Sequence, residues 1–185
     1  HWGANRLAEP AARKGVERET LKGTSPPMTQ LADKDLTETF WDRLEDCRTG
    51  MLVIDGRAVP MSHYVDENKR ELWFITAKGT FMAEHANGTN AHYVLCNDKE
   101  GLYASLSGRL MPEINKEKLD EYWSFIAASW YEDGKQDPDV LLLKLSLDAG
   151  EVWTSKGGAK FFYEIAKANL TDDKPDIGEH FEISF

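Results

Sequence analysis

The sequence predicts a mainly β fold of the α+β class, a small antiparallel barrel of six to seven strands with peripheral helices. Seven short segments of strand character follow one another between residues 51 and 155, and turn-forming residues separate most of them. Residues 101–111 alternate strictly between apolar and polar side chains, as in a strand that buries one face. Helical spacing is confined to three segments. This arrangement suggests a barrel that carries helical decorations.

The first predicted element is a helix over residues 33–47. Asp35 or Thr37 could cap its start. Its apolar residues recur at helical spacing, and they are Leu36, Phe40, Trp41 and Leu44.

The predicted strands begin after Gly50, where the helical spacing ends. Asp55 and Gly56 are typical of a tight hairpin turn after the first strand. The seven segments are residues 51–54, 57–65, 71–76, 90–96, 101–111, 140–147 and 151–155. Helical spacing returns at residues 115–130 and again at 160–168.

The predicted strand at residues 101–111 has one apolar face and one hydroxyl-rich face. The apolar face carries Leu102, Ala104, Leu106 and Leu110. The polar face carries Tyr103, Ser105, Ser107 and Arg109. The polar face is either exposed to solvent or contacts a flat polar ligand or a second subunit, and the sequence favours neither.

Composition and charge exclude several classes of protein. The chain has 185 residues, 41% of them hydrophobic, which indicates a globular domain. Its net charge of −10 argues against nucleic acid or an anionic membrane as the main partner. Cys47 and Cys96 are too few for a disulfide scaffold, and no apolar run approaches the roughly 20 residues of a membrane span. With no signal sequence evident, we expect a cytoplasmic protein.

Residues 1–27 differ in character from the remainder. They carry a charge of +2, which leaves −12 on residues 28–185. We expect them to be an N-terminal extension, either non-native or from an upstream start. The alternative is a native arm that packs on the domain or on a partner subunit. The domain itself is expected to span residues 28–185.

The segment ELWFITAKGT, residues 71–80, is a candidate phosphate site. A buried strand is predicted to end at Thr76, and a turn with Lys78 and Gly79 leads to a helix that begins at Phe81. Backbone N–H groups at a helix start and a lysine ammonium both favour an anion. The segment matches neither the P-loop nor the dinucleotide-binding motif. An ordinary strand-to-helix turn is the alternative interpretation.

No local motif identifies a metal centre or a catalytic triad. The five histidines form no H-x-x-x-H pair, and no G-x-S-x-G elbow is present. The catalytic residues are therefore unknown from sequence. His63 and Tyr103 are the side chains to test, although each also fits a structural role. Trp130 and Tyr131 either pack a helix end or form an aromatic wall beside a ring system.

Taken in order, these elements resemble a known family, the FMN-binding split barrel of the pyridoxamine 5'-phosphate oxidase-like superfamily. More narrowly they resemble its general stress protein branch. The resemblance covers about two thirds of the chain. The matching segments are AVPMSHYVDENKRELWFITAKGT at residues 58–80, LYASLSGRL at 102–110, SWYEDGK at 129–135 and DPDVLLLKLSLDAGEVW at 137–153.

The resemblance implies a homodimer with flavin at the subunit interface. Pro60, Met61 and Ser62 would border the isoalloxazine ring, and Thr76 and Ala77 would hold its polar edge. The remaining contacts implied by the resemblance are Lys78, Gly79 and Thr80 at the ribityl phosphate, and Tyr103, Ser105 and Trp130 from the second chain.

One departure from the family pattern concerns the phosphate. Many relatives carry Ser-x-Lys at the helix start, where Gly79 and Phe81 stand here, so Lys78 is the nearest cation. The cofactor implied is FMN, with FAD or a deazaflavin as alternatives. The function implied is a stress-related reductase or oxidase of a small molecule, with NAD(P)H as a candidate electron donor. The alternative is a non-catalytic flavin- or cofactor-binding split-barrel module.

Overall fold

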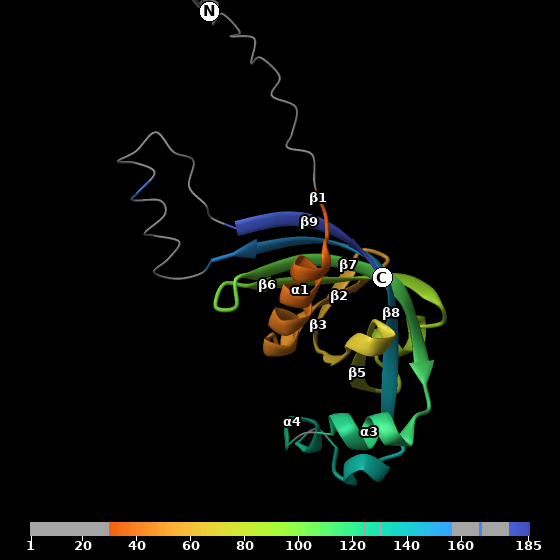
Figure 1. Cartoon of the computed structure of the whole chain (residues 1–185). Helices are drawn as coiled ribbons and strands as arrows, with labels where there is room; N and C mark the ends of the chain where they lie inside the picture. The colour runs from red at the N-terminus through yellow and green to blue at the C-terminus, as the bar shows by residue number, and fades with distance from the viewer. Residues whose placement is uncertain (1–29, 124, 130, 157–166, 168–177) are drawn as a thin grey trace, which may run out of the picture.

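The computed structural model of the chain describes residues 30–123, 125–129, 131–156, 167 and 178–185 (Figure 1). Residues 1–27, Trp130 and all of the expected helix at 160–168 except Lys167 lie outside the described residues. Within the described part the fold is mainly β with few helices, as the sequence predicts.

The described elements comprise nine strands, four α-helices and two short 3-10 helices. The strands are β1 (Gln30–Leu31), β2 (Thr49–Ile54), β3 (Arg57–Ser62), β4 (Tyr64–Asp66), β5 (Glu71–Ala77), β6 (Thr89–Asn97), β7 (Leu102–Glu113), β8 (Val140–Ser155) and β9 (Gly178–Ser184). The helices are α1 (Lys34–Asp46), α2 (Phe81–His85), α3 (Lys116–Tyr122) and α4 (Phe125–Ala128), with the 3-10 helices η1 (Glu67–Lys69) and η2 (Gly134–Gln136).

The strands form one sheet that branches at β8. The main path runs β1-β9-β8-β7-β6-β2-β3, and β4 and β5 lie off it. The first half of β8 pairs with β5 and its second half pairs with β9, while β7 pairs with it along nearly its whole length. All pairings are antiparallel except the short pair of β1 with β9. Among the described strands β3 pairs only with β2, so the sheet is open between β3 and β5.

Several predicted strand boundaries are wrong. Residues 57–65 form two strands, because the chain changes partner at His63: β3 pairs with β2, whereas β4 pairs with β5. The segments 140–147 and 151–155 form the single strand β8, because a register shift opposite Ser107 and Gly108 accommodates the extra residue Asp148. β1 and β9 were not expected at all.

The predicted helices also need correction at their ends. The cap of α1 is Asp33 rather than Asp35 or Thr37, since its carboxylate accepts a hydrogen bond from the Leu36 backbone N–H at 2.9 Å. The single helix expected over residues 115–130 is two, α3 and α4. The apolar stripe of α1 faces the barrel as helical spacing requires: Phe40 and Leu44 are fully buried and Trp41 is nearly so.

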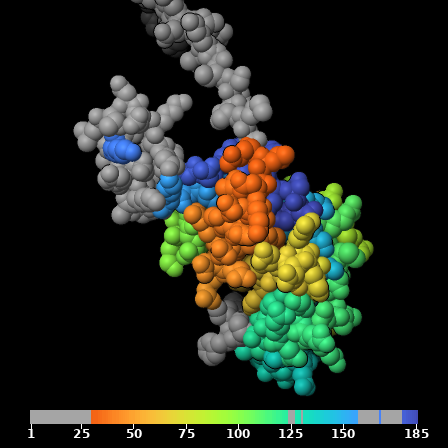
Figure 2. Space-filling model, in the orientation of Figure 1, coloured from red at the N-terminus to blue at the C-terminus, as the bar shows by residue number. Residues whose placement is uncertain are grey.

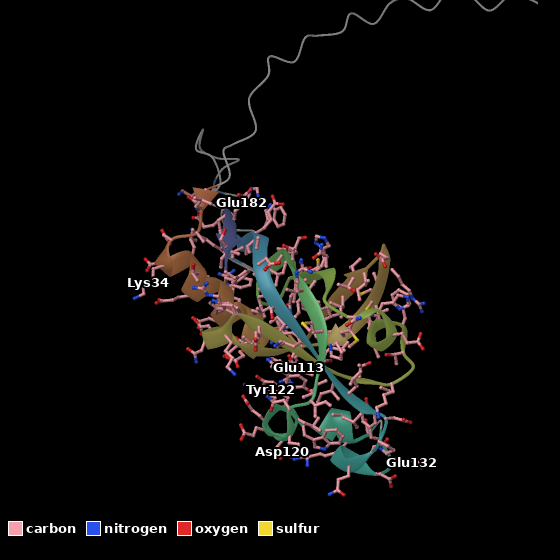
Figure 3. All side chains as sticks on the ribbon, turned by 90° about the vertical axis from the view of Figure 1, so that its right-hand side faces the viewer. Lys34, Glu113, Asp120, Tyr122, Glu132 and Glu182 are labelled. Carbon is pink, nitrogen blue, oxygen red and sulfur yellow. The ribbon has the colours of Figure 1, made fainter. Side chains whose placement is uncertain are left out.

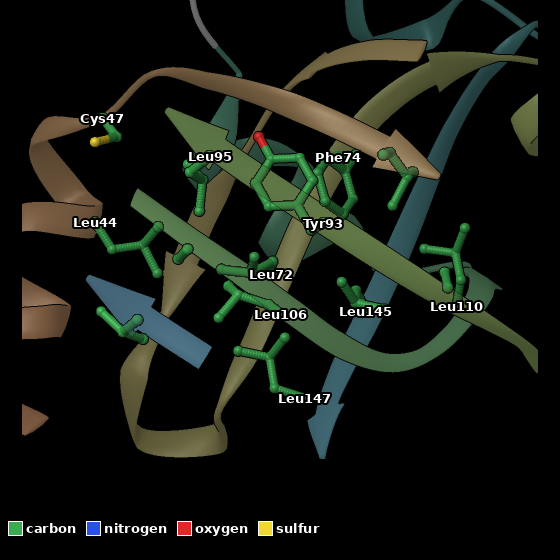
Figure 4. Packing of buried hydrophobic residues seen from close by; sticks show 14 of the residues in the cluster. Leu44, Cys47, Leu72, Phe74, Tyr93, Leu95, Leu106, Leu110, Leu145 and Leu147 are labelled. Atoms are coloured by element: carbon green, nitrogen blue, oxygen red, sulfur yellow. The ribbon is translucent and has the colours of Figure 1, made fainter. Parts of the chain in front are cut away.

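The core fills the inside of the barrel (Figure 4). The apolar face of β7 is buried as predicted, with Leu102, Ala104, Leu106 and Leu110 between 0% and 2% exposed. Tyr93 on β6 and Phe74 on β5 pack edge to face at 5.2 Å between ring centroids. Burying each such leucine or phenylalanine contributes about 1.5–3 kcal/mol.

A smaller cluster lies where α3 packs against the barrel, at the lower end in Figures 1 and 2. Its buried members are Trp73, Tyr122 and Leu142, and Tyr64 stacks on Tyr122 with ring centroids 4.9 Å apart. Figure 3 shows Tyr122 on the side of α3 that faces the barrel. This second cluster therefore fixes α3 near the open side of the sheet.

Candidate functional site

A pocket of about 730 Å³ lies at the opening between β3 and β5. This volume falls within the roughly 300–1,000 Å³ of small-molecule and cofactor sites. The lining residues come from four places: Glu45, Cys47 and Arg48 at the end of α1; Pro60, Met61, Ser62 and His63 on and after β3; Tyr64, Val65, Ile75, Thr76 and Ala77 on β4 and β5; and Tyr122, Ala127 and Tyr131 from the helical segment.

β3 lies at an edge of the described sheet, and this position permits a proline in the pocket wall. Pro60 pairs with Met51 of β2 and has no backbone N–H to donate, which an edge strand tolerates. On the opposite wall, β5 is held by β8 through a full register from Glu71 to Ala77. The pocket therefore has one wall on an edge strand and one on a strand built into the sheet.

Five of the eleven predicted site residues lie together on the pocket wall. They are Pro60, Met61, Ser62, Thr76 and Ala77. The sequence places them on two strands that do not pair with each other, and the branched sheet brings them to opposite sides of one cavity.

The turn after β5 follows the pocket directly but does not line it. Thr80 caps α2: its hydroxyl accepts a hydrogen bond from the Ala83 backbone N–H at 3.3 Å and donates one to the Ala77 carbonyl at 2.8 Å. Gly79 has φ +77°, a left-handed conformation that glycine adopts at little cost. The Lys78 ammonium donates to the Pro138 carbonyl oxygen. A phosphate role for Lys78 therefore stays a prediction, since its hydrogen bond here is to the protein.

A second cation flanks the same turn. The Arg57 guanidinium lies over the Phe81 ring at 4.3 Å from the ring centroid, and Phe81 is the first residue of α2. By contrast, Arg109 donates to the Gly88 carbonyl oxygen at 2.9 Å and so supports a turn. Arg48 is the one arginine or lysine among the described residues that line the pocket.

Tyr103 and Ser105 do not line the pocket of their own chain. They lie on β7, opposite Cys96 and Val94 of β6. The Tyr103 hydroxyl donates to the Asp98 carboxylate, and this hydrogen bond raises the pKa of Tyr103 to about 12. Tyr103 is therefore an uncharged phenol held to its own β6–β7 turn. The predicted contact from Trp130 lies outside the described residues, whereas its neighbour Tyr131 lines the pocket.

The outer face of the sheet carries exposed apolar side chains near Tyr103 and Ser105. We call Met51, Val94 and Trp153 the outer-face patch; they are 38%, 39% and 38% exposed. Met51 pairs with Val94, and Trp153 pairs with Tyr103, so the patch spans β2, β6 and β8. The hydroxyl-rich face of β7 therefore has apolar neighbours in Val94 and Trp153 and a charged neighbour in Glu151, which lies opposite Ser105.

His63 lines the pocket, but both of its ring nitrogens are hydrogen-bonded. Nε2 lies 3.0 Å from the Leu44 carbonyl oxygen and Nδ1 lies 2.8 Å from the Tyr93 hydroxyl. Burial lowers the pKa of His63, so the ring is neutral at physiological pH. Neither His63 nor Tyr103 therefore presents an unengaged proton-transfer group to the pocket.

Apart from His63 and Tyr131, the residues of the remaining pocket walls were not predicted from the sequence. Cys47 is the last residue of the predicted first helix and Arg48 follows it, but nothing local shows that this helix end meets β3. Tyr64 and Tyr122 come together only through the packing of α3 on β4. No group of three or more His, Cys, Asp or Glu side chains that could hold a metal ion occurs among the described residues.

Comparison with known proteins decides the family. A family model described as pyridoxamine 5'-phosphate oxidase like matches residues 35–176. The chain belongs to this family. No curated protein sequence matches the chain. Across the described residues, no helix is long and apolar enough to cross a membrane.

Solved structures of other proteins are similar to the chain over most of its length. A protein described as general stress protein 26 from Jannaschia sp. CCS1 is 50% identical with a TM-score of 0.76, and the match covers 82% of this chain and 98% of that one. A general stress FMN/FAD binding protein from Xanthomonas citri is 32% identical with a TM-score of 0.61, over 68% of this chain and 93% of that one. The resemblance to the general stress protein branch is thereby confirmed.

Proposed function

We propose that the chain is a flavin-binding protein of oxidoreductase type, with FMN in the pocket between β3 and β5. The observation that carries this proposal is the position of the pocket. It joins the two segments that the family resemblance assigns to the ring, Pro60–Ser62 and Thr76–Ala77. The Xanthomonas citri relative, which is described as FMN/FAD binding, supports the cofactor class.

The chemistry of the pocket walls fits a flavin ring. Met61, Val65 and Ile75 offer apolar surface for a flat ring, and three tyrosines line the same cavity. Ser62 and Thr76 supply hydroxyls, and the backbone of the edge strand β3 has groups not taken by a second neighbour. FMN is the first choice, and FAD or a deazaflavin would use the same ring contacts.

The phosphate is proposed to lie at the turn formed by Lys78, Gly79 and Thr80. Lys78 supplies a cation within this turn, and Arg57 supplies a second beside it. The contact with Phe81 keeps the Arg57 charge at the start of α2. The site is therefore expected to favour FMN over riboflavin, because only FMN carries the phosphate.

A homodimer is proposed to complete the site. The outer-face patch and the hydroxyls of Tyr103 and Ser105 form one surface on β7 and its neighbours. A second copy placed there would bury the patch and bring Tyr103 and Ser105 to the flavin of its partner.

The activity proposed is reduction or oxidation of a small molecule, with NAD(P)H as electron donor and a cytoplasmic location. When bound, the flavin supplies the electron-transfer chemistry, and the side chains bind and orient it. A non-catalytic flavin-binding module is the second candidate. It is favoured by the structural hydrogen bonds that occupy both His63 and Tyr103.

Two assays separate these candidates. Purified protein is titrated with FMN and then incubated with NADPH and an artificial electron acceptor. Saturable FMN binding with NADPH oxidation above that of free FMN supports the enzyme, and binding without turnover supports the module. Absence of binding to FMN, FAD and deazaflavin excludes both.

A further inference from the structure

His63 joins two walls of the pocket through buried hydrogen bonds. Its Nε2 lies 3.0 Å from the Leu44 carbonyl oxygen of α1, and its Nδ1 lies 2.8 Å from the Tyr93 hydroxyl. That hydroxyl in turn donates to the Met61 carbonyl oxygen of β3 at 2.8 Å. His63 is 6% exposed and Tyr93 is 0% exposed, so these bonds lie inside the protein.

The hydrogen-bond partners of the two ring nitrogens determine the tautomer of His63. The Leu44 carbonyl can only accept, so Nε2 must carry the imidazole proton. In the neutral ring Nδ1 is then an acceptor, and the single Tyr93 proton serves both Nδ1 and the Met61 carbonyl. Removing the hydroxyl would take the hydrogen-bond donor from the buried Nδ1 and would also remove the bond to the Met61 carbonyl. Each such loss has a substantial cost in a buried setting.

The Tyr93 hydroxyl is inserted where β2 meets β3. Gly50 pairs with Met61 in the register of these strands. A Cβ at Gly50 would come within 2.6 Å of Tyr93 Cζ and 2.8 Å of its hydroxyl oxygen, so only glycine leaves room for the ring. The hydroxyl position is thus fixed by packing on one side and by hydrogen bonds on the other.

These contacts act on the part of β3 that borders the pocket. Met61 and His63 line the pocket together with Pro60 and Ser62. On the other side, Leu44 directly precedes the end of α1, where Glu45, Cys47 and Arg48 line the same pocket. The buried hydrogen bonds therefore set the distance between two walls, and in the described part of the chain no second strand pairs with β3 to do so.

We propose that His63 and Tyr93 are positioning residues for the flavin site. They hold the Pro60–Ser62 wall of β3 at a fixed position relative to the end of α1. This inference rests on the proposed function, because the wall is the one proposed to border the ring. Neither residue needs to touch the flavin for this role.

The test compares four variants of the full chain. Tyr93→Phe and His63→Leu remove the hydrogen bonds, whereas His63→Gln keeps one donor and one acceptor. Phe74→Leu is the matched control, since it disturbs the packing beside Tyr93 and leaves the hydrogen bonds in place. FMN affinity is measured by titration at a temperature at which thermal unfolding shows every variant folded. In parallel, ¹⁵N NMR of the flavin-free wild type reports the His63 tautomer.

Tyr93→Phe and His63→Leu are expected to weaken FMN binding about tenfold, the effect of a lost buried hydrogen bond. His63→Gln is expected to recover part of this loss, and Phe74→Leu to leave FMN affinity within about twofold. The NMR spectrum is expected to show the Nε2–H tautomer.

Two results would overturn the positioning role while the proposed function stands. One is wild-type FMN affinity in both Tyr93→Phe and His63→Leu, and the other is an equal loss in Phe74→Leu. An Nδ1–H tautomer would contradict the hydrogen-bond assignment independently of flavin. If the wild type binds no flavin at all, the proposed function fails, and the positioning role fails with it.

Discussion

The Lys118 ammonium lies 2.9 Å from Asp66 Oδ2, and this ion pair fastens α3 to the end of β4. The two side chains are 14% and 10% exposed, so the pair is largely shielded from water. Lys118 also donates to the Tyr122 hydroxyl at 2.9 Å. Because Tyr122 and its stacking partner Tyr64 both line the pocket, the ion pair supports the aromatic wall of the proposed flavin site.

Lys118→Met should lower the free energy of unfolding by about 1.5–3 kcal/mol, the range for hydrogen bonds to charged groups. The substitution removes the ion-pair partner of Asp66, which keeps, among the described residues, only the hydrogen bond from the Lys69 backbone N–H. Chemical denaturation measures the change. Lys135→Met is the control. Lys135 of η2 pairs with Asp120 of α3, but the Lys135 side chain is 40% exposed and that of Asp120 is 65% exposed. Such an exposed pair contributes less than about 1 kcal/mol. Equal effects of the two substitutions would contradict the role given to Asp66 and Lys118.

The same ion pair should make stability depend on pH in the acidic range. Burial by itself would raise the pKa of Asp66, but the hydrogen bond and charge of Lys118 outweigh it and lower the pKa below its usual value. A carboxylate with a lowered pKa stabilises the fold above its unfolded pKa of about 3.9, and that contribution is lost as the pH falls through the lower, folded pKa. The difference in unfolding free energy between wild type and Asp66→Asn should therefore shrink below about pH 4. A difference that stays constant down to pH 2 would exclude this linkage.

The phosphate contacts can be separated with two substitutions and two ligands. Arg57→Met and Lys78→Ala are each expected to weaken FMN binding by about 1–3 kcal/mol, because each removes a charge beside the turn. Neither should alter the affinity for riboflavin, which lacks the phosphate. Lys78→Ala also removes the hydrogen bond from Lys78 to the Pro138 carbonyl oxygen. If the loss of that bond is what weakens FMN binding, the affinity for riboflavin falls equally. If neither substitution changes FMN affinity, the phosphate lies elsewhere.

The proposed dimer should be sensitive to bulk on β7. Ser105→Trp places a large side chain beside Val94 within the surface proposed to meet a second copy, so it should shift the protein from dimer to monomer. Sedimentation velocity measures the state. Lys34→Trp on α1, where the side chain is 87% exposed, adds the same bulk away from the sheet and should leave the dimer intact. A Ser105→Trp protein that remains dimeric and binds flavin normally would show that this face is not the interface.

The sequence was sufficient where structure follows from local patterning. The alternation in β7 predicted its buried face, and helical spacing predicted the buried stripe of α1. It was insufficient where the outcome depends on distant partners. The break at His63 arises because β3 and β4 pair with different strands, and the continuity of β8 depends on a register shift against β7. Nothing local to residues 57–65 or 140–155 encodes either feature.

The residues of the candidate site likewise fall into those that could be predicted from the sequence and those that depend on distant packing. The family resemblance directed attention to Pro60–Ser62 and Thr76–Ala77, which the fold does bring to one pocket. Arg48 and Tyr122 could not be found, because their place in the pocket depends on how α1 and α3 pack on the barrel. The contact of Lys78 with Pro138 was equally hidden, since it joins residues that meet only through the pairing of β5 with β8.

Titration of the purified full chain with FMN, beside a Ser62→Trp variant that narrows the pocket, tests the central claim most directly. Saturable binding of one FMN per chain in the wild type, and a loss of at least about tenfold in affinity in the folded variant, are expected if the flavin occupies the pocket between β3 and β5. Binding that is absent in the wild type, or unchanged by Ser62→Trp, would contradict the claim.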